Sequence, residues 1–457
     1  MDLMEDLEAD RLAAWVPDVA ADIDLPYLAS GVTSGVEPVF KPLMVPKPDG
    51  AHMQVPVLHP AVIVQLHRAV APLLKPAART LSRGVLSYRQ GADRNWRYSP
   101  AWRVFTQAAA DGAANSHAVV FTDVADFFRS TSWTLVLRCA AALVEDRAIA
   151  NLRAAAVRVS AAGLAHLPSG YSDARLLGNV VLAQAEKRVP VAFVRWVDDY
   201  RLFASSVRFA QRALSELNQG LNELGLTLNS SKTRLLPGAV ASTEMRKLIT
   251  PVFNAQLDSS AVIREKLIGA LHHTAEKPVE RRSELRYALA GLTREREPCF
   301  IDWALAAIWS MPWEIPRLAA YLAAVSKDPR VGVEADIALG RAAEMGDAWR
   351  VARLAPLVIH AQGSHVSKRT LRALVEALPG LAESPAWGLA LRTLSRAGCT
   401  KAVRRVLAER VCDVRAAMVA LRDLDLSLPA GLCSIEPALA EALRYVPAPA
   451  PPVRSLL

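Results

Sequence analysis

The alternation of apolar and polar positions along the chain changes near residue 255. Before that point, runs with the two-residue period of strands alternate with runs that have the helical period of 3.6 residues. Beyond it, the pattern is helical almost throughout. The chain therefore divides into a mixed α+β part and an all-α part.

The first part has the element order of a small sheet covered by helices. Strand patterns cover 119–123 and a hairpin over 193–203, and apolar pairs within 176–181 indicate a helix between them. A second helix covers 208–224, and a short strand pattern at 226–228 follows it directly. This βαββαβ order predicts a ferredoxin-like α+β sheet, with one face buried under helices and the other face open.

The second part shows helix boundaries at short intervals. Gly346-Asp347, Ser384-Pro385 and the segment 398–400 each combine a helix stop or an N-cap with the first residue of a helix. Apolar residues recur at helical spacing in two further segments: Leu371, Leu374, Val375 and Leu378, and Val414, Ala417, Met418 and Leu421. Short helices of this kind are typical of HEAT and armadillo arrays, so we expect an irregular helical-repeat domain.

These patterns give four segments. Residues 1–38 are an acidic N-terminal segment, residues 39–255 the α+β part, residues 256–445 the helical part, and residues 446–457 a proline-rich tail, which we expect to be extended. The longest apolar stretch, 303–325, is interrupted by prolines and charges, which excludes a membrane span there.

The adjacent acids Asp198 and Asp199 are the strongest sign of chemistry in the chain. They lie within the strand-like run 193–203, where two neighbouring carboxylates cost folding energy. Because side chains alternate between the faces of a strand, both carboxylates reach one site only at a tight hairpin turn. Such a pair repels itself unless a cation joins it, and carboxylate oxygens are ligands for Mg²⁺. The alternative is a solvated turn without a metal.

A third carboxylate, Asp123, ends the strand pattern at 119–123 and is followed by Phe127-Phe128. At the end of a neighbouring strand it can face Asp198. Two-metal phosphoryl transfer needs carboxylates arranged in this way, because they hold the ions that clamp the attacking and leaving oxygens.

These residues resemble the motifs of reverse transcriptases. Five segments match, and motifs A, B and C occur in the family's order: a fingers segment at 45–50, motif A at Asp123 with Phe127-Phe128, motif B at 167–170 with Asn179, motif C at 195–199, and motif D at 224–232. The matches cover about residues 39–250 and imply a fingers-palm fold with a ferredoxin-like palm over 39–255. With the long helical extension, the chain resembles the abortive-infection (Abi) and related unknown-group enzymes of bacterial anti-phage defence.

The resemblance implies a role for each charged site residue. Asp123 and Asp198 would bridge the metal ions and Asp199 would be the outer ligand, so that all three are metal-binding and catalytic. The implied cofactor is Mg²⁺, with Mn²⁺ as an alternative. Lys232 matches the motif D lysine, which protonates the pyrophosphate leaving group as a general acid.

Five further residues are implied as substrate contacts. Phe128 stands where polymerases place a bulky side chain that excludes a 2′-hydroxyl, and Lys47 would reach the triphosphate as a point charge. Trp196 would form an apolar wall at the primer end. Ser169 and Gly170 belong to motif B, which contacts the incoming nucleotide.

Four positions depart from the family pattern. Trp196 replaces a Tyr or Phe, Ser169 stands where many relatives have Gln, Ala174 where they have Ser, and Met53 where an Arg is expected. Fewer donors are then available to read the geometry of the nascent base pair. Whether synthesis follows a template is therefore left open.

The charge distribution agrees with a nucleic-acid partner. The net charge is +9, but residues 1–25 carry −7, which leaves +16 for the remainder. A strongly basic body favours phosphate contacts and a salt-sensitive affinity. We therefore expect dNTPs and nucleic acid, as RNA template or DNA product, as partners, and no membrane, and we leave a homo-oligomer open.

Two further features predict a cytoplasmic location. The acidic N-terminus has no signal-peptide pattern. The five cysteines lie far apart, and we expect them to be buried thiols in a reducing compartment.

The function expected from the sequence is an RNA-directed or untemplated DNA polymerase that acts in anti-phage defence by two-metal nucleotidyl transfer. Group II intron and retron-like reverse transcriptases are one alternative. A nucleic-acid-binding scaffold with a vestigial palm is another, and it belongs to a different functional class.

Overall fold

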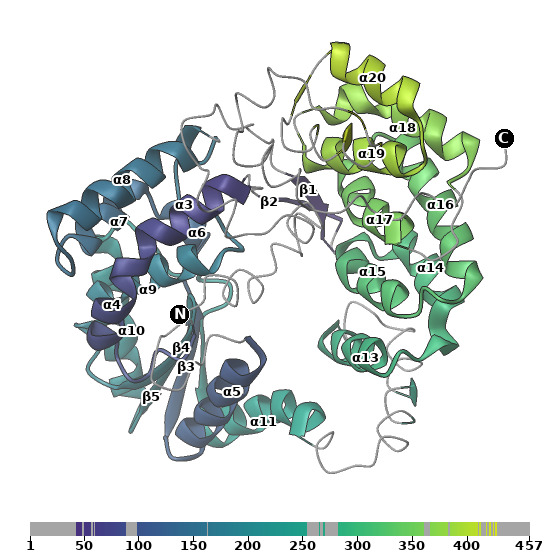
Figure 1. The fold of residues 1–457 in the computed structure, drawn as a ribbon. Coiled ribbons are helices and arrows are strands. Elements are labelled where there is room, and N and C mark those ends of the chain that lie inside the picture. Colours follow the sequence, from purple (N-terminus) through teal and green to yellow (C-terminus); the bar gives the residue numbers. More distant parts are fainter. Residues whose placement is uncertain are drawn as a thin grey trace. The chain divides into compact units, whose positions relative to one another are not determined.

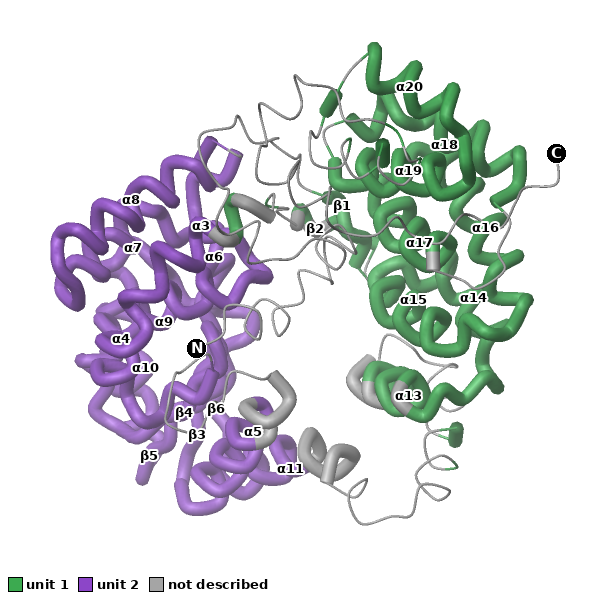
Figure 2. Tube along the Cα trace, in the orientation of Figure 1, with its two compact units in different colours: residues 1–64, 258–457 green, residues 65–257 purple. Residues whose placement is uncertain are grey.

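The protein is mixed α+β and mostly helical, with a small antiparallel sheet (Figure 1). The computed structural model describes residues 43–47, 50–55, 58, 60–87, 98–161, 163–253, 265, 268–269, 282–360, 366–382, 384–409, 411–412, 417, 420–421, 424 and 426. The contacts divide the chain into two compact units, residues 65–257 and residues 1–64 with 258–457 (Figure 2). The division at residue 257 lies close to the boundary expected at residue 255.

The unit of residues 65–257 is built around a four-stranded antiparallel sheet. Its strands are β3 (Ala118–Asp123), β4 (Ala192–Trp196), β5 (Asp199–Ala204) and β6 (Arg234–Pro237), in the spatial order β4-β5-β3-β6. The strand at 119–123 and the hairpin at 193–203 are confirmed.

Two helices cover one face of this sheet, α9 (Ser172–Glu186) and α10 (Val207–Glu223). α10 begins after Ser206, whose Oγ accepts the N–H of Phe209, and Gly225 follows it with a φ of +75° that favours glycine. Both helices expected from the sequence are therefore confirmed. Tyr200 of β5 reaches Glu186 of α9 across this face.

The other face of the sheet is also covered by helices, and this cover reaches Trp196, which is at the same end of the sheet as Asp123. α5 (Tyr98–Ala114) and α11 (Gly238–Phe253) pack against each other and against the sheet. They enclose a core in which Phe105 and Ala109 of α5 meet Val119 of β3 and Trp196 of β4. The expectation of an open face is therefore wrong for the part of this face that α5 and α11 cover, because the apolar residues there require burial.

The strand predicted at 226–228 is also wrong. Leu228 makes only an isolated bridge with Val124, beyond the end of β3. The strand that pairs with β3 on the side away from β5 is 234–237, which joins Phe121 to Arg234 and Ala118 to Pro237. The apolar pattern at 226–228 arises because Leu226 is fully buried below the turn that follows α10.

The remaining elements of this unit are helices. They are α3 (Pro60–Val70), η2 (Ala71–Leu73), α4 (Leu74–Thr80), α6 (Phe127–Ser130), α7 (Trp133–Ala140) and α8 (Asp146–Ala161). Of these, α7 and α4 contact α9, α8 contacts α7, and α3 begins in the other unit.

The other unit contains a two-stranded hairpin, β1 (Leu43–Pro46) with β2 (His52–Val55), and a series of helices. The helices are α13 (Arg282–Glu295), η4 (Pro298–Phe300), α14 (Ile301–Ser310), η5 (Pro312–Glu314), α15 (Ile315–Ala324), α16 (Pro329–Glu344), α17 (Ala348–His360), α18 (Lys368–Leu381), α19 (Pro385–Arg396) and α20 (Thr400–Glu409).

These helices alternate between two layers. α13, α15, α17 and α19 contact one another in sequence, and α14, α16 and α18 do the same. The three helix starts expected at 347, 384 and 400 are confirmed, and Ser384 caps α19 by accepting the N–H of Ala386. The helix expected over 414–421 lies largely outside the described residues, as do the segments 1–38 and 446–457.

The described residues bear on two further expectations, which concern membrane-spanning helices and the burial of the cysteines. None of the helices described is long and apolar enough to cross a membrane. Cys139 is buried as expected, but Cys299 is exposed and Cys399 and Cys412 are half-buried, so the expectation of buried thiols is wrong for these three. Cys433 lies outside the described residues.

Candidate functional site

The carboxylates of the site come from the end of β3 and from the turn between β4 and β5. Asp123 is paired with Asp199 in the register of β3 and β5, and Asp199 is paired with Trp196 across the β4–β5 hairpin. Val197 and Asp198 form the two-residue turn. The tight hairpin expected from the sequence therefore places Asp198 at the same end of the sheet as Asp123, and the N–H of Val124 donates to the carbonyl oxygen of Asp198 at 3.2 Å.

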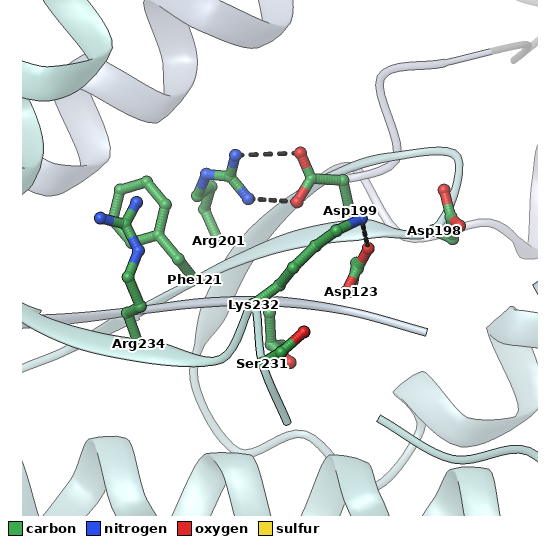
Figure 3. A pocket seen from close by; sticks show the side chains of 9 residues that line it. Phe121, Asp123, Asp198, Asp199, Arg201, Ser231, Lys232 and Arg234 are labelled. Atoms are coloured by element: carbon green, nitrogen blue, oxygen red, sulfur yellow. Dashed lines mark hydrogen bonds and ion pairs between the residues drawn. The ribbon is translucent and has the colours of Figure 1, made fainter. Parts of the chain in front are cut away.

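The turn at 229–233 brings Lys232 to this end of the sheet. The N–H of Asn229 donates to the carbonyl oxygen of Asp123 at 2.8 Å, and the hydroxyls of Thr122 and Thr233 are 2.7 Å apart. From this turn, Lys232 Nζ donates to Asp123 Oδ2 at 2.6 Å (Figure 3). The lysine and the carboxylates thus come from three separate segments of the chain.

The carboxylates interact electrostatically. Burial, together with the charges of Asp123 and Asp199, raises the pKa of Asp198 to about 6. The hydrogen bond to Asp123 and the other two carboxylates raise the pKa of Lys232, although its side chain is 67% exposed. Asp123 is buried, and no described residue donates a hydrogen bond to its Oδ1. The site therefore holds negative charge that Lys232 only partly neutralises.

Asp199 is held by a different cation. Arg201 lies two residues further along β5, on the same face, and forms a two-point ion pair with Asp199. The guanidinium groups of Arg201 and Arg234 lie over the ring of Phe121, at 4.4 Å and 5.2 Å from its centroid. These residues line one pocket together with the carboxylates, Thr122, Ser231 and Lys232 (Figure 3).

Asp123 and Asp198 have carboxylate oxygens that could bind a divalent cation. Asp123 keeps an oxygen to which no described residue donates, and Asp198 is a half-buried carboxylate whose charged form is destabilised by desolvation and by the neighbouring carboxylates. Among the described residues, no group of three His, Cys, Asp or Glu side chains is arranged to hold a metal ion. A pair of carboxylates is nevertheless enough for Mg²⁺, which takes its other ligands from phosphates and water.

The two phenylalanines after Asp123 have different surroundings. Phe127 is buried, and its ring fits against Gly178 of α9, where an added Cβ would come within 2.7 Å of it. Phe128 is half-buried and touches Phe127 edge to face at 5.2 Å. Phe127 therefore fills the core position, and Phe128 is left with part of its ring accessible.

The other expected substrate contacts lie outside the pocket lining. Trp196 is 8% exposed and packs edge to face against Trp102 of α5 at 5.1 Å. Ser169 and Gly170 are half-buried in the turn before α9. Lys47 is exposed at the turn of the β1–β2 hairpin, in the other compact unit. The carboxylates and Lys232 are therefore the expected residues that the structure brings together.

Sequence reasoning missed Arg201 and Arg234. The two-residue period of β5 puts Arg201 on the face of Asp199, so this period could have identified Arg201 as a partner. Arg234 had no such signal, because β6 was expected eight residues earlier. No protein-family model matches the chain, and no curated protein matches it either.

Proposed function

We propose that the protein is a reverse transcriptase of the Abi and unknown-group type, a DNA nucleotidyltransferase that extends a DNA strand from dNTPs with or without an RNA template. The observation that carries the proposal is the convergence of Asp123, Asp198 and Lys232 at one end of the sheet. Three sequence motifs that resemble motifs A, C and D supply these residues, and chance matches would have no reason to meet in space.

The strand order supports a palm. A βαββαβ chain with the sheet order β4-β5-β3-β6 has its first and third strands in the centre, as in ferredoxin-like folds. The catalytic carboxylates then lie on the central strand β3 and on the hairpin beside it. The two-layer helical unit supports the further proposal of a HEAT- or armadillo-like domain, which is the feature that favours the defence-associated enzymes over group II intron and retron-like relatives.

Asp123 and Asp198 would hold the Mg²⁺ or Mn²⁺ ion, and Asp199 would join them only after leaving Arg201. The bound cation would activate the attacking hydroxyl and stabilise the pyrophosphate leaving group. Lys232 holds a proton at Nζ within reach of this site. While Lys232 remains bonded to Asp123 its raised pKa retains that proton, so its role as a general acid requires the Lys232–Asp123 contact to open.

The partners follow from this chemistry. The substrates are dNTPs, and the basic body of the chain supports binding of a nucleic-acid strand. The half-buried ring of Phe128 supports exclusion of ribonucleotides, and the exposed Lys47 would contact phosphate. A cytoplasmic site of action also belongs to the proposal and depends on the sequence alone, whereas a homo-oligomer is left open.

The experiment is incubation of the purified full-length protein with Mg²⁺ and labelled dNTPs, with and without an RNA template and primer. Asp123→Ala and Asp198→Ala should each reduce incorporation by roughly 10³-fold or more, because each removes a cation ligand. Asp111→Ala, an exposed acid of α5, is the control and should leave incorporation unchanged. Wild-type incorporation in either site variant would refute the assignment.

One observation favours a second candidate function, a nucleic-acid-binding scaffold with a vestigial palm. Two of the three carboxylates are already neutralised by cations of the chain itself, Asp123 by Lys232 and Asp199 by Arg201. Such a protein would bind RNA or DNA with equal affinity in the presence of Mg²⁺ and of a chelator, and would incorporate no label. Incorporation that the alanine variants lose excludes it.

A further inference from the structure

The turn that carries Asp198 has a strained backbone. Val197, the first of its two central residues, has a φ of 56°, in the left-handed region. A β-branched residue rarely adopts this conformation, and turns of this kind favour glycine at that position. The local sequence therefore does not hold the turn in its observed shape, and contacts from elsewhere must do so.

Two such contacts hold the peptide groups on either side of Val197. Its N–H donates to Ser87 Oγ at 2.7 Å, and its carbonyl oxygen accepts a hydrogen bond from Arg195 Nη1. Ser87 and Arg195 are fully buried. The orientation of the turn is therefore fixed by one hydroxyl and one guanidinium, both shielded from water.

Ser87 is itself held in place. Its carbonyl oxygen accepts a hydrogen bond from Asn179 Nδ2 of α9 at 2.8 Å. The residues before it run beside β4, where the N–H of Arg195 donates to the carbonyl oxygen of Gly84 at 2.8 Å and the N–H of Leu86 donates to that of Arg195 at 3.1 Å. The segment 84–87 thus continues the sheet next to the turn.

Arg195 is oriented by the same helix. Its Nε donates to Glu186 Oε1 at 2.5 Å and its Nη1 donates to Asn179 Oδ1 at 2.6 Å. Tyr200 OH donates to the same Glu186 oxygen at 3.1 Å. A buried ion pair of this kind adds little net stability, because desolvation of the two charges offsets their attraction. What it does supply is a fixed geometry.

We propose that Ser87 and Arg195 are positioning residues of the site, which hold both peptide groups of Val197 and thereby keep the carboxylate of Asp198 beside Asp123. The proposal rests on the proposed function, in which Asp198 is a cation ligand. Residues that orient a ligand without touching the metal commonly change metal affinity by 10- to 100-fold when they are replaced. The buried network would have that effect here.

The test uses the full chain and Mn²⁺ alone as the probe, with free Mn²⁺ measured by electron paramagnetic resonance. Ser87→Ala removes the acceptor of the Val197 N–H and should raise the Kd for Mn²⁺ by roughly tenfold. The control is Ser206→Ala, which also removes a hydroxyl that accepts a backbone N–H, but at the start of α10. It should lose stability and keep the wild-type Kd.

Two further variants separate positioning from general damage. Val197→Gly in the Ser87→Ala background should restore the Kd to within about threefold of wild type, because glycine adopts a φ of 56° without strain. Arg195→Gln combined with Glu186→Gln removes both buried charges together, so neither is left unpaired. This double variant should fold and bind Mn²⁺ more weakly.

A wild-type Kd in folded Ser87→Ala protein, or no recovery with Val197→Gly, would overturn the positioning role. Absence of Mn²⁺ binding by the wild-type protein would instead overturn the proposed function. The positioning role would then be decided by hydrogen exchange of the Val197 amide, measured on a peptide that spans 196–200. Exchange of this amide must accelerate in Ser87→Ala and not in Ser206→Ala. An unchanged rate in Ser87→Ala would reject the positioning role.

Discussion

Arg201 donates hydrogen bonds to both carboxylate oxygens of Asp199, at 2.5 Å and 2.9 Å. Two-point contacts between arginine and a carboxylate are stronger and more directional than a single ion pair. The third carboxylate of the site is therefore turned toward a guanidinium group and away from Asp123 and Asp198. If Asp199 were released from Arg201, the site would gain a third carboxylate without any change in the fold.

Replacement of Arg201 should release Asp199. In Arg201→Gln, a third carboxylate becomes available and one positive charge is lost, so Mn²⁺ should bind severalfold more tightly than in the wild-type protein. Arg234→Gln is the control, since Arg234 lies over the same ring but pairs with Glu244. The Kd for Mn²⁺, measured by electron paramagnetic resonance, checks this. Weaker binding in Arg201→Gln than in Arg234→Gln would contradict it.

Asp198 makes the stability of the metal-free protein depend on pH. Its folded-state pKa of about 6 lies above the ordinary value of 3.8, so the folded state binds a proton more tightly than the unfolded state does. Ionised Asp198 therefore destabilises the fold fully above about pH 6, and this cost disappears as the pH falls toward 4.

Asp198→Asn should accordingly raise the free energy of unfolding at pH 8 by up to about 3 kcal/mol, and by nothing at pH 4. Urea unfolding with a chelator present, at both pH values, measures this difference. Glu145→Gln, at an exposed acid before α8, is the control and should show no such difference between the two pH values. An equal gain for Asp198→Asn at both pH values would rule out ionisation as the cause.

Phe128 and Phe127 should respond differently to truncation. Phe128→Ala should raise the ratio of ribonucleotide to deoxyribonucleotide incorporation, because it removes the ring expected to clash with a 2′-hydroxyl. Phe127→Ala should instead cost about 3 to 5 kcal/mol of stability, because Phe127 fills the core against Gly178. Thermal unfolding and competition between labelled rNTPs and dNTPs measure the two effects. An unchanged ratio in Phe128→Ala would leave that residue a packing role only.

The packing of α11 against the sheet can be tested at Gly238. A Cβ there would lie 1.8 Å from the carbonyl oxygen of Ser116, so Gly238→Ala should displace α11 and cost about 3 kcal/mol or more of stability. Gly380→Ala in α18 is the matched control, because no atom lies within 4 Å of its added Cβ. That change should stabilise the protein by up to about 1 kcal/mol. Equal unfolding temperatures for the two variants would contradict the packing.

The sequence was sufficient for the hairpin and for the helices on either side of it. Alternation along a strand determines which face of the sheet each side chain is on. Two adjacent acids can reach one site only at a turn, so the proximity of Asp198 to Asp123 could be predicted from local rules. The position of β6 did not follow, because 226–228 and 234–237 are both short runs with two leucines each. Which of them pairs with β3 depends on the turn at 229–233, which a single sequence does not encode as a period.

The contacts of buried charged residues could not be predicted from local sequence patterns either. Arg195 is fully buried within a strand, and only the position of Glu186 and Asn179 on α9 makes that burial tolerable. Likewise, α5 could not be assigned to the sheet face of Asp123 from its own pattern. Contacts between distant segments decide both features.

If the sheet binds a nucleic-acid strand, as proposed, the helices α5 and α11 limit the length of strand that it can contact. On β3, Asp123 and Phe121 border the pocket, but Phe121 is only 5% exposed and belongs with Val119 to the core under α5. The part of β3 left open therefore ends within two residues of Asp123, about 7 Å of strand, or roughly two nucleotide steps. A nucleic-acid strand that contacts so small a surface would dissociate readily between nucleotide additions. Processive synthesis would therefore depend on contacts with other parts of the protein.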